Sequence, residues 1–177
     1  MTETIDATEQ ATQPPFAAIV DEHGGSVFRL AKSVVRDDAL ADDVAQETFI
    51  KVWKNLDSFR GDGSLRGWIL RIAHNEAVST LRRIRDSATD PQKLPERVDA
   101  IGTTRIVEGR IAESELIDAL DQLDELSRAI VVLREVEGLS YDDIATTLDV
   151  PIPTVKTRLL RARRELSRQL EGWRATP

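Results

Sequence analysis

Apolar residues along this chain recur three and four positions apart, which is the spacing of one face of an α-helix. The clearest stripe lies near the C-terminus and consists of Val155, Leu159, Ala162, Leu166 and Leu170. Similar spacing predicts helices over residues 16–35, 39–55, 68–85, 113–126 and 128–137. The pattern therefore predicts an all-α protein, in which Gly24 and Gly25 are expected to loosen the first helix and Ser127 to cap the helix over 128–137.

The stretch 138–170 has the form of a helix-turn-helix. Ser140 is placed to cap a short first helix, and Asp143 stands three residues later, as in a capping box. Prolines then interrupt the helical pattern before a second helix that is expected to start at Pro153–Thr154. Away from its apolar stripe this second helix carries Lys156, Arg158, Arg161, Arg163, Arg164 and Arg168. Such a helix can enter the DNA major groove by its N-terminal half, although an ordinary helical hairpin with a solvated basic face has the same pattern.

The predicted helix over 39–55 has two distinct faces. A broad stripe expected to be buried consists of Leu40, Ala41, Val44, Ala45, Phe49, Val52, Trp53 and Leu56. A second face brings together Asp43, Gln46, Glu47 and Ile50. An acidic face that includes an apolar residue suits a partner protein, whereas the charges alone also fit a solvated surface. A metal site built from Asp37, Asp38, Asp42 and Asp43 is disfavoured because no histidine or bridging loop completes the ligand shell.

A loop with three glycines, Ser58–Gly67, precedes a helix rich in arginine. A flexible polar loop beside a basic helix can hold an unstacked base of single-stranded nucleic acid. Trp68 is a candidate to stack on such a base, but a tryptophan at the start of an amphipathic helix more often belongs to the core.

The net charge of −7 hides two basic blocks. Residues 58–85 carry six Lys or Arg against two Asp or Glu, and residues 151–177 carry seven against two. Between them, residues 86–110 contain prolines, glycines and charges of both signs, which indicates a linker between two domains. Because charges are screened over about 8–10 Å, a local basic face can still bind phosphate on an acidic protein.

Several classes of protein are disfavoured by the sequence. There is no cysteine, so the chain has no disulfide framework or thiolate metal site. His23 and His74 lie far apart in sequence and lack a nucleophile motif, which argues against a hydrolase. No apolar run is long enough to span a membrane, and residues 1–13 lack the features of a signal peptide. A cytoplasmic protein with a short disordered leader is expected.

Two groups of motifs carry a resemblance to a known family. The second conserved region of bacterial sigma-70-type factors resembles residues 42–49 (DDVAQETF), 59–61 (FRG) and 67–75 (GWILRIAHN). The fourth region resembles residues 134–145 (REVEGLSYDDIA) and 154–163 (TVKTRLLRAR). Two regions joined by a linker resemble the extracytoplasmic-function (ECF) group. The expected domains are a leader at 1–13, region 2 at 14–85, a linker at 86–110, region 4 at 111–172 and a tail at 173–177.

The resemblance implies a sigma factor, which is not an enzyme and needs no cofactor or metal. It binds core RNA polymerase through the β′ clamp helices and the β subunit, recognises promoter DNA and helps to open it. The polymerase-binding residues would be Asp43, Gln46, Glu47 and Ile50. The −10 element would be bound by Phe59, Arg60, Asp62, Ser64, Arg66, Arg71 and Asn75. The −35 element would be bound by Thr154, Lys156, Thr157, Arg158, Leu160 and Arg161. An anti-sigma factor is an expected partner.

Two departures from the family pattern bear on these expectations. Pro153 stands where the family often has a small residue, and it is compatible with a helix start but alters the approach to DNA. The Gly24–Gly25 pair is the other departure. The alternative to a sigma factor is a conventional DNA-binding regulator, in which residues 14–85 would sense a signal or dimerise.

Overall fold

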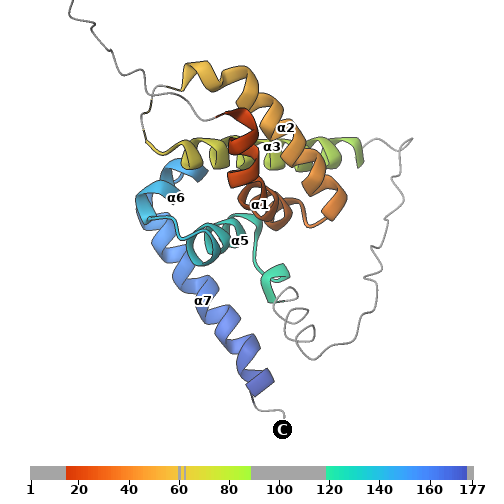
Figure 1. Ribbon diagram of the computed structural model, residues 1–177. Coiled ribbons are helices and arrows are strands. Elements are labelled where there is room, and N and C mark those ends of the chain that lie inside the picture. The colour runs from red at the N-terminus through yellow and green to blue at the C-terminus, as the bar shows by residue number, and fades with distance from the viewer. Residues whose placement is uncertain (1–14, 60, 62, 89–118, 175–177) are drawn as a thin grey trace, which may run out of the picture.

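The computed structural model describes residues 15–59, 61, 63–88 and 119–174, and within these residues every regular element is helical (Figure 1). The N-terminal bundle consists of α1 (Phe16–Val35), α2 (Asp38–Asn55), the 3₁₀ turn η1 (Leu56–Ser58) and α3 (Leu65–Ala88). The C-terminal bundle consists of α5 (Glu125–Val131), the π-helical turn η2 (Val132–Val136), α6 (Tyr141–Leu148) and α7 (Ile152–Arg174). The predicted all-α class is confirmed. The leader at 1–13, nearly all of the linker at 86–110 and residues 175–177 lie outside the described residues.

In the N-terminal bundle, α1, α2 and α3 all pack against one another. Fully buried residues from the three helices form its core: Val27, Leu30, Val34, Val44, Val52, Ile69, Leu70 and Ala73. Asp37 caps α2 by accepting a hydrogen bond from the Leu40 amide at 2.8 Å. The third helix starts at Leu65, three residues earlier than expected, which shortens the predicted glycine-rich loop.

The expectation that Gly24 and Gly25 loosen the first helix is wrong, because α1 runs through both without a break. Buried residues flank the pair on both sides, so tertiary packing outweighs the low helix propensity of glycine. Gly25 also leaves room for a neighbour. A Cβ atom at this position would lie 3.0 Å from Nη1 of Arg29, which turns toward the C-terminal bundle.

In the C-terminal bundle, the prediction of a helix over 128–137 with Ser127 as its cap is wrong about both the start and the cap. The helix starts at Glu125, and Asp124 caps it by accepting a hydrogen bond from the Ser127 amide at 3.0 Å. It continues into the π-helical turn η2 and ends at Gly138, whose φ of 69° is a left-handed conformation that favours glycine.

The helix-turn-helix expected from the sequence is present. Ser140 caps α6 by accepting from the Asp143 amide, and its hydroxyl donates to the Asp143 carboxylate at 2.6 Å. Asp149, in a left-handed conformation with φ of 55°, ends α6. The second helix, α7, starts at Ile152, next to the expected start at Pro153–Thr154, and runs to Arg174. Its stripe is confirmed at Val155, Leu159 and Ala162, which are buried, while the side chain of Leu170 lies outside the described residues.

The two bundles pack directly against each other, a point on which the sequence was silent. Helix α3 packs against α6, and α1 packs against α5 and η2 (Figure 1). One hydrophobic cluster therefore includes buried residues of both bundles. Polar contacts supplement this packing. Arg36 pairs with Asp121 at 2.7 Å, and the buried Arg128 donates from Nε to the Ser33 carbonyl of α1.

The central polar contact between the bundles is the side chain of Glu137, which is 1% exposed. Its Oε1 accepts from Nε of Arg29 at 2.7 Å, and its Oε2 accepts from the Ser26 hydroxyl at 2.6 Å. Arg66, at the start of α3, pairs with the same carboxylate and also donates to the Glu137 carbonyl at 3.0 Å. One carboxylate of the C-terminal bundle therefore holds two helices of the N-terminal bundle.

We expect Glu137→Gln to loosen the packing between the bundles. Breaking a buried ion pair costs about 3–5 kcal/mol, and here we expect on the order of 2 kcal/mol because both arginines are partly exposed and glutamine still forms hydrogen bonds. Urea denaturation should show the loss of stability, and small-angle X-ray scattering should show a larger radius of gyration.

The matched control is Glu135→Gln. Glu135 is two residues away and pairs with Arg163 inside the C-terminal bundle, with both side chains about half-exposed. Its replacement should change stability by less than about 1 kcal/mol and leave the radius of gyration unchanged. Equal effects of the two substitutions would contradict the role assigned to Glu137.

Candidate functional site

The acidic face of α2 lies at the surface, beside a groove. Asp43, Gln46 and Glu47 are exposed, and Ile50 is 43% exposed. The first three line a groove of about 710 Å³ between α2 and α3, whose other wall includes Glu76, Thr80, Arg83 and Ile84. All four predicted polymerase-binding residues are thus accessible on one helix.

An apolar hollow adjoins this groove on α2. It has a volume of about 390 Å³ and is lined by Phe16, Gln46, Phe49, Ile50 and Trp53. Gln46 lines both concavities, so they form one continuous surface, which we call the α2 surface. It combines carboxylates on one side with aromatic rings on the other; aromatic side chains are enriched at protein interfaces, and charged groups are found mainly at their rims.

Trp53 was expected to be buried, and this is wrong because its side chain is 64% exposed. The buried line of α2 runs through Ala41, Val44, Thr48 and Val52, and Trp53 lies about 100° further around the helix. Its ring instead meets that of Phe16 edge-on, with centroids 5.1 Å apart. The spacing of three residues from Ile50 is the signal that places Trp53 on the same face.

The glycine-rich loop joins η1 to α3. Gly61 and Gly63 have φ values of 76° and 102°, which side chains rarely adopt. Phe59 and Trp68 flank the loop and contact each other with ring centroids 5.4 Å apart, so Trp68 is half-buried. Two predicted contacts of this loop, Arg60 and Asp62, lie outside the described residues.

The other predicted contacts of the −10 element lie in different surroundings. Ser64 accepts a hydrogen bond from the Gly67 amide at 3.0 Å and so helps to start α3. Arg71 and Asn75 are exposed, and their spacing of four residues places them on one face of α3. Arg66, by contrast, is turned toward Glu137 of the C-terminal bundle. The structure therefore does not present all of these residues on a single free surface.

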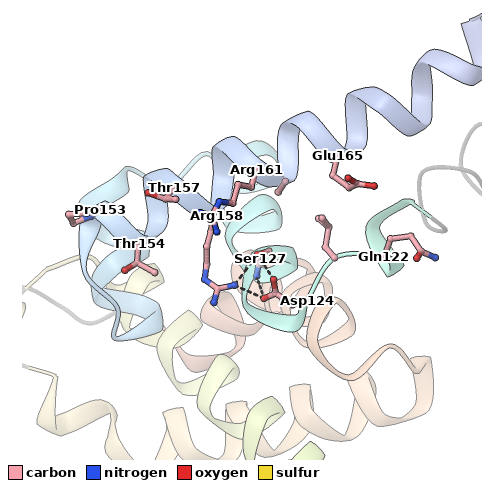
Figure 2. A pocket seen from close by; sticks show the side chains of 11 residues that line it. Gln122, Asp124, Ser127, Pro153, Thr154, Thr157, Arg158, Arg161 and Glu165 are labelled. Atoms are coloured by element: carbon pink, nitrogen blue, oxygen red, sulfur yellow. Dashed lines mark hydrogen bonds and ion pairs between the residues drawn. The ribbon is translucent and has the colours of Figure 1, made fainter.

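The predicted contacts of the −35 element lie on the first three turns of α7. Lys156, Thr157, Leu160 and Arg161 are exposed on adjoining positions, and Leu160 is 50% exposed. Thr154 and Arg158 are less exposed and face a groove of about 540 Å³ between α7 and the start of α5 (Figure 2). Pro153 also lines this groove, so it lies inside the first turn without disrupting the helix.

Carboxylates pair with three of the six basic side chains between residues 156 and 168 of α7. Arg158 pairs with Asp124 at 2.8 Å, Arg163 with Glu135 at 2.6 Å, and Arg168 with Glu165 at 2.6 Å. Among the described residues, no ion pair is formed by Lys156, Arg161 or Arg164. Lys156 lies instead over the Tyr141 ring, 5.7 Å from its centroid. Two of these three unpaired side chains, Lys156 and Arg161, therefore lie on the surface of α7 that is predicted to face DNA.

Within the described part of the chain, no cluster of His, Cys, Asp or Glu side chains is arranged to hold a metal ion. The acidic group at Asp37, Asp38, Asp42 and Asp43 is thus not assembled as a metal site. None of the helices that the structure describes is long and apolar enough to cross a membrane.

Comparison with known proteins decides the family. The profile described as "Sigma-70 region 2" matches residues 19–87, and "Sigma-70, region 4" matches residues 113–166. The chain is 33% identical over 177 residues to the RNA polymerase sigma-H factor of Pseudomonas aeruginosa, covering 94% of this chain and 92% of that protein. The chain belongs to the ECF group of the sigma-70 family.

Two further relatives support this assignment. The ECF sigma factor SigE of Mycolicibacterium smegmatis is 36% identical over 171 residues, which cover 93% of this chain and 65% of that protein. The structure of the sigma factor RpoE of Bartonella quintana, in complex with the anti-sigma factor NepR, superimposes with a TM-score of 0.77 at 26% identity. That match covers 88% of this chain and 96% of RpoE.

Two buried groups of this sigma factor have shifted pKa values. Burial alone raises the pKa of Glu137, but the hydrogen bonds and charges of Arg29, Ser26 and Arg66 outweigh burial and hold it below the ordinary value of 4.5. Burial lowers the pKa of His74 below 6.5, and the Glu125 carboxylate opposes this only in part. Nδ1 of His74 is buried and has no hydrogen-bond partner in the described structure.

We expect acid to destabilise this sigma factor in two steps. Below about pH 6.5, His74 becomes protonated in the unfolded chain but stays neutral in the folded chain until a lower pH. The free energy of unfolding therefore decreases as the pH is lowered. The contribution of Glu137 is complete above its unfolded pKa near 4.5 and is lost as pH falls through its lower folded pKa. Urea denaturation at a series of pH values should show that His74→Gln removes the upper step and Glu137→Gln the lower one. A profile that neither substitution alters would refute this assignment.

Proposed function

We propose that this protein binds core RNA polymerase through the α2 surface, recognises promoter DNA at a −35 and a −10 element, and promotes DNA opening at the start of transcription. The observation that carries the proposal is the pairing of an accessible acidic and aromatic surface on α2 with a helix-turn-helix whose second helix exposes unpaired cations. A polymerase-bound factor needs both surfaces, whereas a regulator that acts alone needs only the second.

The polymerase would contact the α2 surface with its β′ clamp helices. Helices with a basic and apolar face would match the carboxylates of Asp43 and Glu47 and the exposed side chains of Ile50 and Trp53. Aromatic side chains often dominate the binding energy of such interfaces, while charges set the rate and register of association. We therefore add Phe16 and Trp53 to the proposed docking residues.

The −35 element would be read by the exposed side of α7. Lys156 and Arg161 supply charge for phosphates or guanine, Thr157 supplies a hydroxyl, and Leu160 supplies an apolar contact. The C-terminal bundle positions this helix through the buried residues Val155 and Leu159. Because carboxylates pair with Arg158, Arg163 and Arg168 on α7, we infer that the bundle alone binds DNA weakly and depends on polymerase to hold it at the promoter.

The −10 element would be captured by the glycine-rich loop together with Arg71 and Asn75. Unstacking a base costs a few kcal/mol, which contacts made only to the opened strand can offset. Arg66 would take part after it leaves Glu137, so we infer that promoter opening follows separation of the two bundles. The RpoE structure contains an anti-sigma factor, and we propose that this chain has such a partner in the cytoplasm as well.

The experiment that tests the proposal is in vitro transcription by purified core polymerase over a library of random promoters, with and without this protein. Start sites that depend on the protein and share two spaced elements would support the proposal and supply promoters for further work. Binding to palindromic duplex without polymerase, and no dependent transcripts, would favour the conventional regulator instead.

We expect Asp43→Lys combined with Glu47→Lys to weaken binding to core polymerase on the order of tenfold at moderate salt, because both substitutions reverse charges in the proposed interface. Fluorescence anisotropy of labelled protein titrated with core polymerase measures this affinity. Asp21→Lys combined with Glu22→Lys is the matched control, since these exposed residues of α1 undergo the same charge change. Equal losses in both variants would indicate a general effect of charge.

We expect Arg161→Ala to reduce transcription from −35-dependent promoters about tenfold while polymerase binding is unchanged, because it removes one base or phosphate contact. Arg168→Ala, which removes a guanidinium paired with Glu165 on the same helix, should have little effect. Initial rates of transcript formation measure both variants. If Arg161→Ala reduced polymerase binding in proportion to transcription, its assignment to DNA would be wrong.

A further inference from the structure

The ion pair between Arg158 and Asp124 lies at the edge of the proposed DNA-binding surface. Nη1 of Arg158 is 2.8 Å from Oδ1 of Asp124 and 3.2 Å from the Ser127 hydroxyl (Figure 2). Arg158 belongs to α7, whereas Asp124 precedes α5, so the pair connects the proposed recognition helix to the element behind it. The resemblance assigned Arg158 to DNA, yet here the guanidinium already has an anionic partner.

Asp124 is a fixed negative charge. Its carboxylate accepts hydrogen bonds from the Ser127 amide at 3.0 Å and from the Ser127 hydroxyl at 2.7 Å. Burial alone raises the pKa of Asp124, but the Ser127 hydrogen bonds and the Arg158 charge hold it below the ordinary value of 3.8. The carboxylate is therefore ionised at neutral pH and is kept in place by its role as a helix cap.

The groove beside the pair combines groups that suit a phosphodiester. Its α7 wall carries Thr154, Thr157, Arg158 and Arg161, which offer hydroxyls and guanidinium groups (Figure 2). The opposite wall carries Asp124 and Ser127. Arg158 can therefore face either a DNA phosphate, alongside Thr157 and Arg161, or the protein's own carboxylate.

Exchange between these two anions requires little energy. The side chains of Arg158 and Asp124 are 37% and 59% exposed, and pairs with such exposure contribute little to stability. Guanidinium groups bind carboxylates and phosphates in the same geometry and at similar distances. The ion pair is thus too weak to be explained as a major support of the fold and strong enough to compete for one phosphate.

We propose that Asp124 is an internal competitor for Arg158. The Asp124 carboxylate pairs with the guanidinium in place of a DNA backbone phosphate. It thereby lowers both the affinity of the −35 contact for DNA and the dependence of that affinity on salt. This inference rests on the proposed sigma function. It makes Asp124 a residue that sets DNA affinity without touching DNA, because it acts through Arg158.

The test is Asp124→Asn in holoenzyme assembled from core polymerase and the full chain, bound to a promoter duplex selected in the library experiment. Asparagine still caps a helix well, because its Oδ1 can accept from the Ser127 amide while its Nδ2 can donate to the Ser127 hydroxyl, so the fold is preserved. Releasing Arg158 adds about one phosphate contact, which steepens the slope of log K against log salt by about 0.9. The strength of the ion pair limits the gain in affinity, which should be up to about fivefold at about 0.1 M salt.

Asp149→Asn is the matched control. Asp149 is exposed in the same bundle, its φ of 55° is one that asparagine tolerates, and its replacement removes the same charge without freeing an arginine. It should change the salt slope much less than Asp124→Asn. In the Arg158→Gln background, Asp124→Asn should change the salt slope no more than Asp149→Asn does, because only the general effect of removing a negative charge remains.

The outcomes separate this inference from the function on which it rests. A steeper slope that requires Arg158 supports competition. An equal effect of the two Asp→Asn substitutions, or an effect of Asp124→Asn that stays larger than that of Asp149→Asn when Arg158 is replaced by Gln, would overturn it. Weaker binding by Asp124→Asn would also overturn it and would show that Asp124 orients Arg158 for DNA. Failure of the proposed function would appear earlier, as a lack of protein-dependent start sites.

Discussion

The buried carboxylate of Glu137 is the contact on which the arrangement of the two bundles depends. A charge that is 1% exposed has to be compensated, and here Arg29, Arg66 and Ser26 compensate it from α1 and α3. The local backbone makes this possible. The π-helical turn η2 and the left-handed Gly138 bracket Glu137 and let the chain turn back into α6. A second glycine, Gly25, leaves space for the Arg29 guanidinium.

The same carboxylate links the closed arrangement to the proposed function through Arg66. This arginine follows the glycine-rich loop, and the resemblance assigns it to the opened −10 strand. The Arg66 guanidinium pairs with Glu137, so the proposed contact with DNA would compete with this ion pair for the same side chain. The ion pair between Arg66 and Glu137 in the free protein thus opposes the proposed DNA contact. Polymerase binding on α2 would have to supply the free energy that is needed to break this pair.

Local features of the fold could be predicted from the sequence because they depend on nearby residues. The Ser140 cap and the Val155, Leu159 and Ala162 stripe follow from spacing alone. The predictions that were wrong concern packing between distant residues. Trp53 fits an apolar stripe by type, and its spacing from Ile50 was the one sequence signal for the exposed face, but the direction of the buried line of α2 depends on packing against the other helices. Gly24 and Gly25 disfavour a helix intrinsically, but the core on both sides outweighs that preference. Glu137 belongs to no periodic pattern, so its partners 71 and 108 positions away could not be inferred.

Ion pairing limits the positive charge that the proposed recognition helix of this acidic protein would present to DNA. On α7, carboxylates of the same bundle occupy Arg158, Arg163 and Arg168, while Lys156, Arg161 and Arg164 form no ion pair with a described residue. Each phosphate contact adds about 0.9 to the salt slope, so the number of unpaired cations limits how much affinity electrostatics can supply. The sequence counts the charges, but only the structure shows which are already neutralised. Asp124 and Glu135 therefore act locally, because each pairs with one arginine of α7. Neither pairs with Lys156 or Arg161, so the exposed side of the first turns of α7 remains positively charged.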